Sequence, residues 1–315
     1  MDIDLVYLWV DGNDPVWRAR KDEFLGIEKT WDETICRGRY ANNNELRYSL
    51  RSVEKHLPWI RKIFIITDRQ TPAWLNTSHP NVQIVDHREI LPEEALPCYN
   101  STVIEYFLYR IPGLSEHFLY GNDDMFFNAD LSPSFFFAED GFPYVRLQRK
   151  FFGEWRYRWK EWWGKELSVY RTTILKSARM VAARYGIFYF GTPHHNVDAY
   201  RKTDYEAVVE TVFKQEITDC ILHHKRSPDD IQRAVFLYYA LAVGHAHLKY
   251  GGRKESCIID GKKPDYAKQL RRYHPKLFCL NDNQYVTEMD RERIQPFLEN
   301  LFSMKSLFEK EGIWS

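Results

Sequence analysis

The residues best suited to chemistry stand in one stretch, His117 to Leu131, with the sequence HFLYGNDDMFFNADL. The apolar run Phe118 to Tyr120 is typical of a buried strand, and two adjacent acids, Asp123 and Asp124, follow the Gly-Asn that ends it. In open α/β sheets, ligands bind outside the carboxyl ends of the strands, where carboxylate oxygens can hold Mg²⁺ or Mn²⁺. Because Gly, Asn and Asp are also the common turn residues, the stretch alone fits a metal site or a polar turn.

A second apolar run, Leu277 to Leu280 (LFCL), ends in the same way, in the sequence NDN that contains Asp282. If both strands lie in one sheet, Asp124 and Asp282 can meet around one cation. Between them in the chain lie His194-His195 and Arg226. A metal neutralises phosphoryl oxygens, an arginine binds them with two N–H groups, and a histidine moves a proton. Together these residues fit phosphoryl chemistry, although each alone is more often structural.

The composition argues against nucleic acid as a partner. The chain of 315 residues carries 44 basic and 44 acidic residues, so no net field attracts nucleic acid or an anionic membrane. No apolar run approaches the ~20 residues that a membrane-spanning helix needs. We therefore expect any membrane contact to be peripheral.

The cysteines and the N-terminal residues predict a cytoplasmic protein. The five cysteines are Cys36, Cys98, Cys220, Cys257 and Cys279. They are odd in number and none has the spacing of a zinc knuckle or a redox pair, so we expect reduced thiols. The opening sequence, MDIDLVYLWVDG, lacks the basic start of a signal peptide.

Alternating segments predict the sheet that positions the candidate residues. Strands are predicted at Ile3 to Val10, Lys62 to Thr67 and Val82 to Val85, and helices at Glu45 to Leu57 and Ser101 to Arg110. This alternation indicates a mostly parallel α/β sheet covered on both faces. Asp4 lies within the first strand, where a buried carboxylate needs a structural or functional partner.

The segment Phe151 to Lys165, FFGEWRYRWKEWWGK, mixes aromatic and basic residues. It fits a helix with a tryptophan-lined core face and solvated bases, or a surface that contacts a polymer or a membrane. Further helices are predicted at Tyr205 to Phe213, Ile231 to Val243 and Asp290 to Phe302.

Five stretches of the chain resemble the four conserved regions of the Stealth family. They are IDLVYLWVDGNDPVW (Ile3 to Trp17), NNNELRYSLRSVEKHLPWIRKIFIITDRQTPAWLN (Asn42 to Asn76), GNDDMFF, TPHH and LFCLNDN. The family comprises bacterial capsular-polysaccharide phosphotransferases and the catalytic core of the animal N-acetylglucosamine-1-phosphotransferase. The similarity runs from Ile3 to about Phe308 in the family's order. It implies a glycosyltransferase-A-like α/β core with helical additions.

The resemblance also implies an activity. The chain would transfer a hexose 1-phosphate, typically from UDP-GlcNAc, to a hydroxyl of an oligosaccharide or polysaccharide acceptor. UMP would leave, and a phosphodiester-linked capsular polysaccharide or exopolysaccharide would form, with Mg²⁺ or Mn²⁺ as cofactor. The expected location is cytoplasmic, with a peripheral contact at the inner membrane or the capsule-assembly machinery.

The family's functional residues carry over by position in its motifs. The catalytic residues implied are Asp4, Asp124, His194 and Arg226; the substrate-binding ones are Asn44, Glu45, Arg47, Glu105, Asp123 and His195; the metal ligands are Asp124 and Asp282. The doubled histidine leaves His194 and His195 as alternatives for the catalytic role. The expected parts are a nucleotide-sugar-binding core at 1–140, an aromatic and basic helical insertion at 141–190, and the rest of the catalytic core with a C-terminal helix at 191–315.

Two other functions fit the same residues. A conventional glycosyltransferase would use the same acids and the same donor, attack the sugar carbon and release UDP rather than UMP. An inactive glycan-binding module would use the tryptophan-rich segment and turn over no donor. The nucleotide released therefore distinguishes the three.

Overall fold

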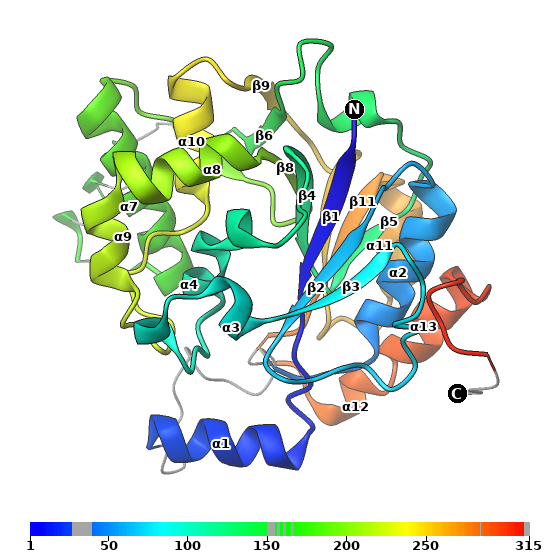
Figure 1. Cartoon of the computed structure of the whole chain (residues 1–315). Helices are drawn as coiled ribbons and strands as arrows, with labels where there is room; N and C mark the ends of the chain where they lie inside the picture. The colour runs from blue at the N-terminus through cyan, green and yellow to red at the C-terminus, as the bar shows by residue number, and fades with distance from the viewer. Residues whose placement is uncertain are drawn as a thin grey trace.

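A five-stranded sheet lies at the centre of the molecule (Figure 1). The computed structural model describes residues 1–26, 40–149, 155, 158–159, 162–164, 167–283 and 285–311. The strand order is β3-β2-β1-β4-β8, with β1 Ile3–Leu8, β2 Ile63–Thr67, β3 Val82–Asp86, β4 His117–Asn122 and β8 Asp198–Arg201. The first four strands are parallel, and β8 runs antiparallel to β4 at one edge. The predicted mostly parallel α/β sheet with helical additions is confirmed.

Strand β1 contributes side chains to two cores, because successive residues of a strand point to opposite faces. Leu5 packs in one core with Leu50 of α2 (Glu45–His56), on the face that α2 covers in Figure 1. Val6 packs in the other core with residues of α7 (Val169–Tyr185) and α10 (Ala234–Ala242). Burial on both faces explains why the strands are almost entirely apolar.

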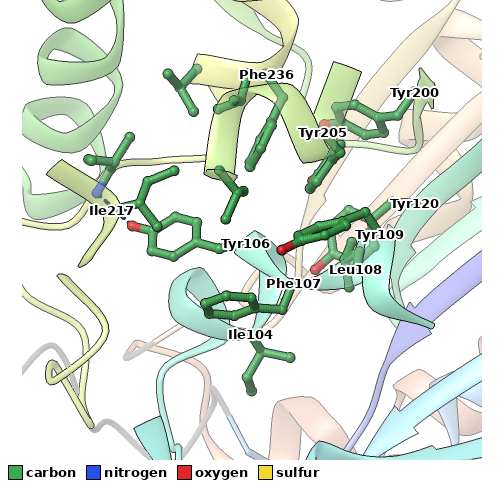
Figure 2. Packing of buried hydrophobic residues seen from close by; sticks show 14 of the residues in the cluster. Ile104, Tyr106, Phe107, Leu108, Tyr109, Tyr120, Tyr200, Tyr205, Ile217 and Phe236 are labelled. Carbon is green, nitrogen blue, oxygen red and sulfur yellow. Dashed lines mark hydrogen bonds between the residues drawn. The ribbon is translucent and has the colours of Figure 1, made fainter. Parts of the chain in front are cut away.

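Aromatic rings fill the core beside α10 (Figure 2). The rings of Tyr205, in α8 (Lys202–Ala207), and Phe236 stack with centroids 3.6 Å apart. Tyr205 also meets Tyr200 of β8 edge-on at 5.1 Å. The backbone N–H of Ile231 donates to the Tyr106 hydroxyl, 2.9 Å away. These contacts fix the segment before α10 relative to the sheet.

Two smaller sheets flank the central one. The first has the order β10-β11-β5, with β10 Ser256–Asp260, β11 Leu277–Asn281 and β5 Met125–Phe127; the second has the order β7-β6-β9, with β7 Thr192–Pro193, β6 Tyr144–Gln148 and β9 His247–Tyr250. The idea that the two acid-tipped strands share one sheet is therefore wrong. They come together because β5, which follows the acids after β4, pairs antiparallel with β11.

The remaining helices are α1 Pro15–Leu25, α3 His87–Ile90, α4 Ser101–Tyr106, α5 Pro133–Phe136, α9 Lys214–Cys220, α11 Tyr266–Tyr273, α12 Glu288–Arg291 and α13 Ile294–Leu301, with 3₁₀ turns at Glu93–Ala95 and Leu108–Arg110 and a π-helical turn at Val208–Val212. The predicted single helix from 290 to 302 is wrong, because α12 and α13 are separate helices. Thr287 and Asp290 form a capping box that starts α12.

A buried ion cluster ties α2 to the last described segment. Glu309 accepts hydrogen bonds from Arg47 Nε at 2.6 Å and from Arg51 Nε at 2.7 Å. Arg51 also donates to the carbonyl of Phe302 at 2.7 Å. All three charged residues are buried. The cluster therefore holds α2, and with it the residues at its N-terminus, in a fixed position.

The aromatic and basic segment lies mostly outside the described residues. Its described tryptophans, Trp155, Trp159, Trp162 and Trp163, are 64–79% exposed, so the expectation that they form a core face is wrong for these four. In the same region α7 shares a core with α10, and the division at residues 140 and 190 stays a prediction. Across the described part of the chain, no helix combines the length and apolarity needed to cross a bilayer.

The described cysteines agree with the prediction of reduced thiols. Cys98, Cys220, Cys257 and Cys279 are free and buried. Cys36 lies outside the described residues.

Candidate active site

A cavity of about 430 Å³ opens at the carboxyl ends of the parallel strands. β1 contributes Leu8, β4 contributes Asn122, and α2 contributes its first residue, Glu45. The sequence-predicted residues that line the cavity are Glu45, Asp123, Asp124, His195, Arg226 and Asp282. They come from five separate stretches of the chain, and the sheet brings them together at the edge where ligands bind in such folds.

The acidic turn between β4 and β5 presents Asp124 to the cavity. The backbone N–H of Leu280 donates to the Asp124 carbonyl at 2.9 Å, and Cys279 Sγ donates to Asp124 Oδ2 at 3.2 Å. Among the described residues, the buried Oδ1 atom of Asp124 has no hydrogen-bond partner. Buried polar atoms are normally satisfied, so this oxygen is suited to a ligand.

Three carboxyl groups share this end of the cavity. Burial raises the pKa of Glu45 to about 7, although the backbone N–H and the side-chain amide of Asn43 both donate to it at 2.6 Å. Burial also raises the pKa of Asp124 to about 6. Burial, then the charges of Glu45 and Asp124, raise the pKa of Asp123. A positive charge bound among these groups would favour their ionised forms.

Of the two adjacent histidines, His195 lines the cavity. Its ring meets the ring of Tyr170 edge-on at 6.0 Å. Burial, with the positive charges of Arg233 and Arg226, lowers the pKa of His195 to about 4. The imidazole is therefore neutral near pH 7 and has a ring nitrogen that can accept a proton.

Two arginines supply positive charge beside His195. Arg226 lines the cavity, and its Nη2 donates to Ser101 Oγ at 2.6 Å. Arg233 is buried behind the cavity lining, where its Nη2 lies 3.3 Å from Asp198 Oδ2 and donates to the Asn196 carbonyl at 3.1 Å. Arg226 is thus placed to meet a ligand, and Arg233 acts through the groups around it.

Within the described residues, Asp124, His195 and Cys279 form a group able to hold a metal ion. One potential ligand atom from each lies within 4.8 Å of the others. The unpaired Asp124 oxygen fits a divalent cation, because nothing else in the described residues satisfies it. The metal prediction for Asp124 is therefore compatible with the geometry.

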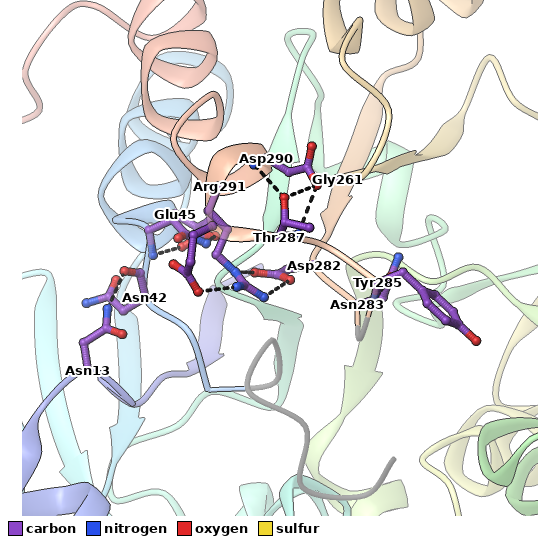
Figure 3. Close-up of polar contacts among 12 residues, drawn as sticks. Asn13, Asn42, Glu45, Gly261, Asp282, Asn283, Tyr285, Thr287, Asp290 and Arg291 are labelled. Carbon is purple, nitrogen blue, oxygen red and sulfur yellow. Dashed lines mark hydrogen bonds and ion pairs between the residues drawn. The ribbon is translucent and has the colours of Figure 1, made fainter. Parts of the chain in front are cut away.

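Asp282 lines the cavity from the end of β11 but already has a partner (Figure 3). Arg291 donates to both of its carboxylate oxygens, Nε at 2.7 Å and Nη2 at 2.9 Å. This bidentate pair neutralises the charge that a cation would use. The structure therefore favours Asp124 over Asp282 as the main metal ligand.

Asp4, predicted to be catalytic, lies at the opposite end of the sheet. Its oxygens accept from Arg61 Nε at 2.9 Å, from Arg61 Nη2 at 2.6 Å and from the Ser115 backbone N–H at 2.7 Å. Arg61 and Ser115 precede β2 and β4, so Asp4 fastens the amino ends of three strands. Asp4 is therefore held in structural contacts away from the cavity lining, and a catalytic role for it stays a prediction.

Arg47, predicted to bind substrate, is also placed elsewhere, in the buried pair with Glu309. Glu105 is buried below the cavity and accepts a hydrogen bond from the Tyr120 hydroxyl at 2.9 Å. Burial raises its pKa, against the charges of Arg233 and Arg226. These two residues support the site without lining it.

The other member of the histidine pair, His194, is 3% exposed and is not part of the cavity lining. Asn44, at the N-cap of α2, has a left-handed φ of 63° and lines a second, more polar pocket of about 590 Å³. That pocket also includes Asn42, Asn43 and Arg291. Since Arg291 pairs with Asp282 and Asn43 with Glu45, the two pockets adjoin.

The sequence reasoning missed Arg233, Cys279 and the aromatic residues of the lining. Arg233 carried one signal, since it is a charged residue at the start of an otherwise apolar helix, α10. No feature of the sequence pointed to Cys279, because a cysteine in an apolar strand is usually interpreted as a buried core residue. Its contact with Asp124 spans 155 positions of sequence.

The fold and cavity define an α/β protein with an acid-lined ligand site at the carboxyl ends of its strands. Residues 39–145 match the model of Stealth protein conserved region 2, and residues 1–29 match that of conserved region 1. The receptor polysaccharide phosphotransferase WefC of Streptococcus gordonii is 31% identical over 98% of this chain and 98% of its own. The capsular polysaccharide phosphotransferase fcs1 of Haemophilus influenzae is 34% identical over 89% of this chain and 78% of its own. The chain belongs to the Stealth family.

Other relatives are longer. An exopolysaccharide phosphotransferase of Streptomyces coelicolor is 34% identical over 98% of this chain, which spans 52% of that relative's length. Among solved structures, the galactosyltransferase LgtC in complex with donor and acceptor sugar analogues aligns over 96% of both chains, with 11% identity and a TM-score of 0.48.

Proposed function

We propose that this chain transfers a sugar 1-phosphate from a nucleotide diphosphate sugar to a glycan hydroxyl, and so builds a phosphodiester-linked capsular polysaccharide or exopolysaccharide. The observation that carries the proposal is the meeting of Asp124, His195 and Arg226 in one cavity. Phosphoryl transfer depends on placing positive charge, a proton acceptor and a metal-binding carboxylate around one phosphate. The names of the related polysaccharide phosphotransferases support the same reaction class.

The proposed reaction breaks and forms bonds at phosphorus. An acceptor hydroxyl oxygen attacks the β-phosphorus of UDP-GlcNAc, the donor that the family resemblance favours. The bond from that phosphorus to the bridging oxygen of the diphosphate breaks, and UMP leaves with the electron pair. The acceptor proton passes to a base. The bond from the anomeric carbon to oxygen stays intact, so the configuration of the sugar is retained.

We assign the proton acceptor to His195 and the charge-stabilising role to Arg226. The neutral imidazole of His195 can take a proton, and a bound diphosphate would raise its pKa by offsetting the charges of Arg226 and Arg233. The Arg226 guanidinium can bind phosphoryl oxygens with two N–H groups. Ser101 fixes the guanidinium before the substrate arrives.

A divalent cation, Mg²⁺ or Mn²⁺, fits the acidic turn. Asp124 would hold it through its unpaired oxygen, with Asp282 nearby at the cavity wall. When bound, the cation would neutralise charge on the diphosphate. Asp123 and Glu45 would orient the sugar, since buried carboxyl groups can accept hydrogen bonds from hydroxyls.

The acceptor glycan would approach through the adjoining polar pocket that Asn44 lines. Amide and carboxylate side chains there can bond to sugar hydroxyls, and the shared Asp282–Arg291 pair lies between the two pockets. Nucleotide sugars are cytoplasmic substrates, so we place the reaction on the cytoplasmic side, with a peripheral contact to the inner membrane or to capsule assembly.

The test is to incubate the chain with a panel of nucleotide sugars and acceptor oligosaccharides, and to follow the products by phosphorus NMR. A new phosphodiester signal with release of UMP supports the proposal. Release of UDP would instead identify a conventional glycosyltransferase, and binding of glycan without donor turnover would identify a binding module.

The variant Arg226→Ala tests the charge-stabilising role of this arginine. Losing one charge-stabilising donor costs ~10²–10³-fold in kcat in comparable sites, so we expect a loss of that size with an unchanged melting temperature. Arg271→Ala, at an exposed position, is the control and should retain full activity. Full activity of Arg226→Ala would remove this arginine from the mechanism.

A further inference from the structure

The cavity lining contains two sets of residues of different chemistry. The first set is the acids, His195 and Arg226 described above. The second set comprises four aromatic side chains and a histidine, which we call the aromatic end: Trp9, Trp17, Tyr40, Tyr99 and His87. The proposed reaction uses only the first set, so the aromatic end has no assigned role.

The rings of the aromatic end are held close together. The centroid of Trp17 lies 5.4 Å from that of Tyr40 and 5.6 Å from that of Tyr99. The Tyr40 hydroxyl donates to the Tyr99 carbonyl at 3.0 Å, and the Gly12 backbone N–H donates to the Tyr40 carbonyl at 2.8 Å. A Cβ at Gly12 would lie only 2.1 Å from that carbonyl oxygen. Glycine is therefore required for the close approach that positions Tyr40.

One polar group of the aromatic end has no partner among the residues that the structure describes. Trp17 is 2% exposed and lines the cavity, yet its indole Nε1–H has no acceptor among the described residues. Most buried donors in proteins are paired, and tryptophan can only donate. An unpaired donor on a residue of the cavity lining therefore favours a ligand that brings an acceptor atom.

The neighbouring histidine is neutral. Burial lowers the pKa of His87 to about 4, against the charges of Asp68 and Asp86. A neutral imidazole has one nitrogen that donates and one that accepts. The aromatic end therefore combines aromatic side chains, the indole N–H of Trp17 and the neutral imidazole of His87. This combination suits a planar, uncharged heterocycle with carbonyl and N–H groups on its edge.

We propose that the aromatic end binds the nucleobase of the donor and that Trp17 Nε1–H donates to a ring carbonyl oxygen of that base. This inference rests on the proposed function and adds the recognition of the donor's base. Aromatic side chains stack on the faces of bases, and the indole N–H makes the site prefer a carbonyl-bearing base such as uracil over adenine. Arg226 and Asp124 line the same cavity, so the diphosphate of that donor can reach them.

The test is binding of UMP, AMP and ribose 5-phosphate to the full chain by isothermal titration calorimetry, without turnover. Trp17→Phe keeps an aromatic ring and removes the N–H. Loss of one buried hydrogen bond corresponds to ~10-fold in affinity, so we expect UMP binding to weaken by about that factor and ribose 5-phosphate binding to stay unchanged. Trp59→Phe is the matched control, because Trp59 Nε1 donates to the Leu131 carbonyl at 2.6 Å outside the cavity lining.

The outcomes separate the two proposals. If wild-type protein binds UMP and Trp17→Phe binds it equally well, the base-recognition inference is overturned while the proposed function stands. If wild-type protein binds no nucleotide, the proposed function fails as well. If Trp17→Phe does not fold, the affinities of the wild-type protein for UMP and AMP test the inference instead. Equal affinity for the two nucleotides overturns it.

Discussion

Two adjacent histidines lie in different environments in this protein. His195 lines the cavity, whereas His194 is buried outside it. They directly follow β7, and the chain bends at His195. The sequence alone left both as catalytic candidates, because the side that each faces depends on how β7 pairs with β6.

The first prediction compares the two histidines. His195→Gln should lower kcat for sugar-phosphate transfer by ~10²–10⁴-fold, the usual contribution of a general base. His194→Gln should keep kcat within a few-fold of wild type, since it removes no group from the cavity lining. Initial rates at saturating donor measure the difference, with melting temperatures to confirm folding. Equal losses in both variants would contradict the assignment.

The second prediction concerns the buried carboxyl groups. The folded-state pKa of Asp124, about 6, and of Glu45, about 7, lie above their ordinary values. The folded protein therefore binds more protons than the unfolded chain between about pH 4 and pH 7, and these groups make stability fall as pH rises through that window. A cation that binds the ionised groups only in the folded state should offset the loss.

Melting curves measure this coupling. Added Mn²⁺ or Mg²⁺ should raise the melting temperature more at pH 8 than at pH 5, because protonated Asp124 binds a cation poorly. Asp124→Asn is the control, and its cation-induced shift should be small at both pH values. An equal shift in wild type and Asp124→Asn would show that the cation binds elsewhere.

At the scale of elements, the parallel strands could be predicted and the small sheets could not. β1, β2 and β4 are runs of buried apolar residues, which sequence alone identifies. β9 is exposed along its whole length and consists of His247, Leu248, Lys249 and Tyr250. Neither its hydrophobic periodicity nor its composition therefore predicts a strand. Its pairing with β6 comes from tertiary contacts.

The same limit applies to the candidate site. Asp123, Asp124 and Asp282 could be predicted because each directly follows an apolar strand. The sequence could not show that Asp4 and Arg47 lie in ion pairs outside the cavity lining, because a buried charge looks the same in sequence whether it binds substrate or pairs with another charge. Only the positions of Arg61 and Glu309 reveal the pairing.

The third prediction belongs to α2 and its partner. Glu309→Ala leaves Arg47 and Arg51 buried without their shared carboxylate. Removing one partner of a buried ion pair costs about 3–5 kcal/mol, so we expect the free energy of unfolding in urea to fall by that amount. Glu311→Ala, two residues further along at an exposed position, should leave stability unchanged. Near-equal stability of the two variants would refute a structural role for the cluster.

At the scale of the whole molecule, the site exists only when distant segments have all packed. Glu45, Asp124, His195, Arg226 and Asp282 stand on different elements, and two hydrophobic cores on opposite faces of the sheet hold those elements. The cavity therefore depends on the integrity of most of the described chain. If residues 1–140 were expressed alone, β4 would lack its partner strand β8. The cavity would also lack the segment that carries Arg226.

The pairing of α2 with Glu309 has a consequence for biosynthesis. Arg47 and its carboxylate partner are 262 positions apart. At a synthesis rate of ~5–20 residues per second, the helix waits roughly 13–50 s on the ribosome before that neutralising group is made. Throughout this interval Arg47 and Arg51 lack the Glu309 carboxylate that neutralises them in the folded protein.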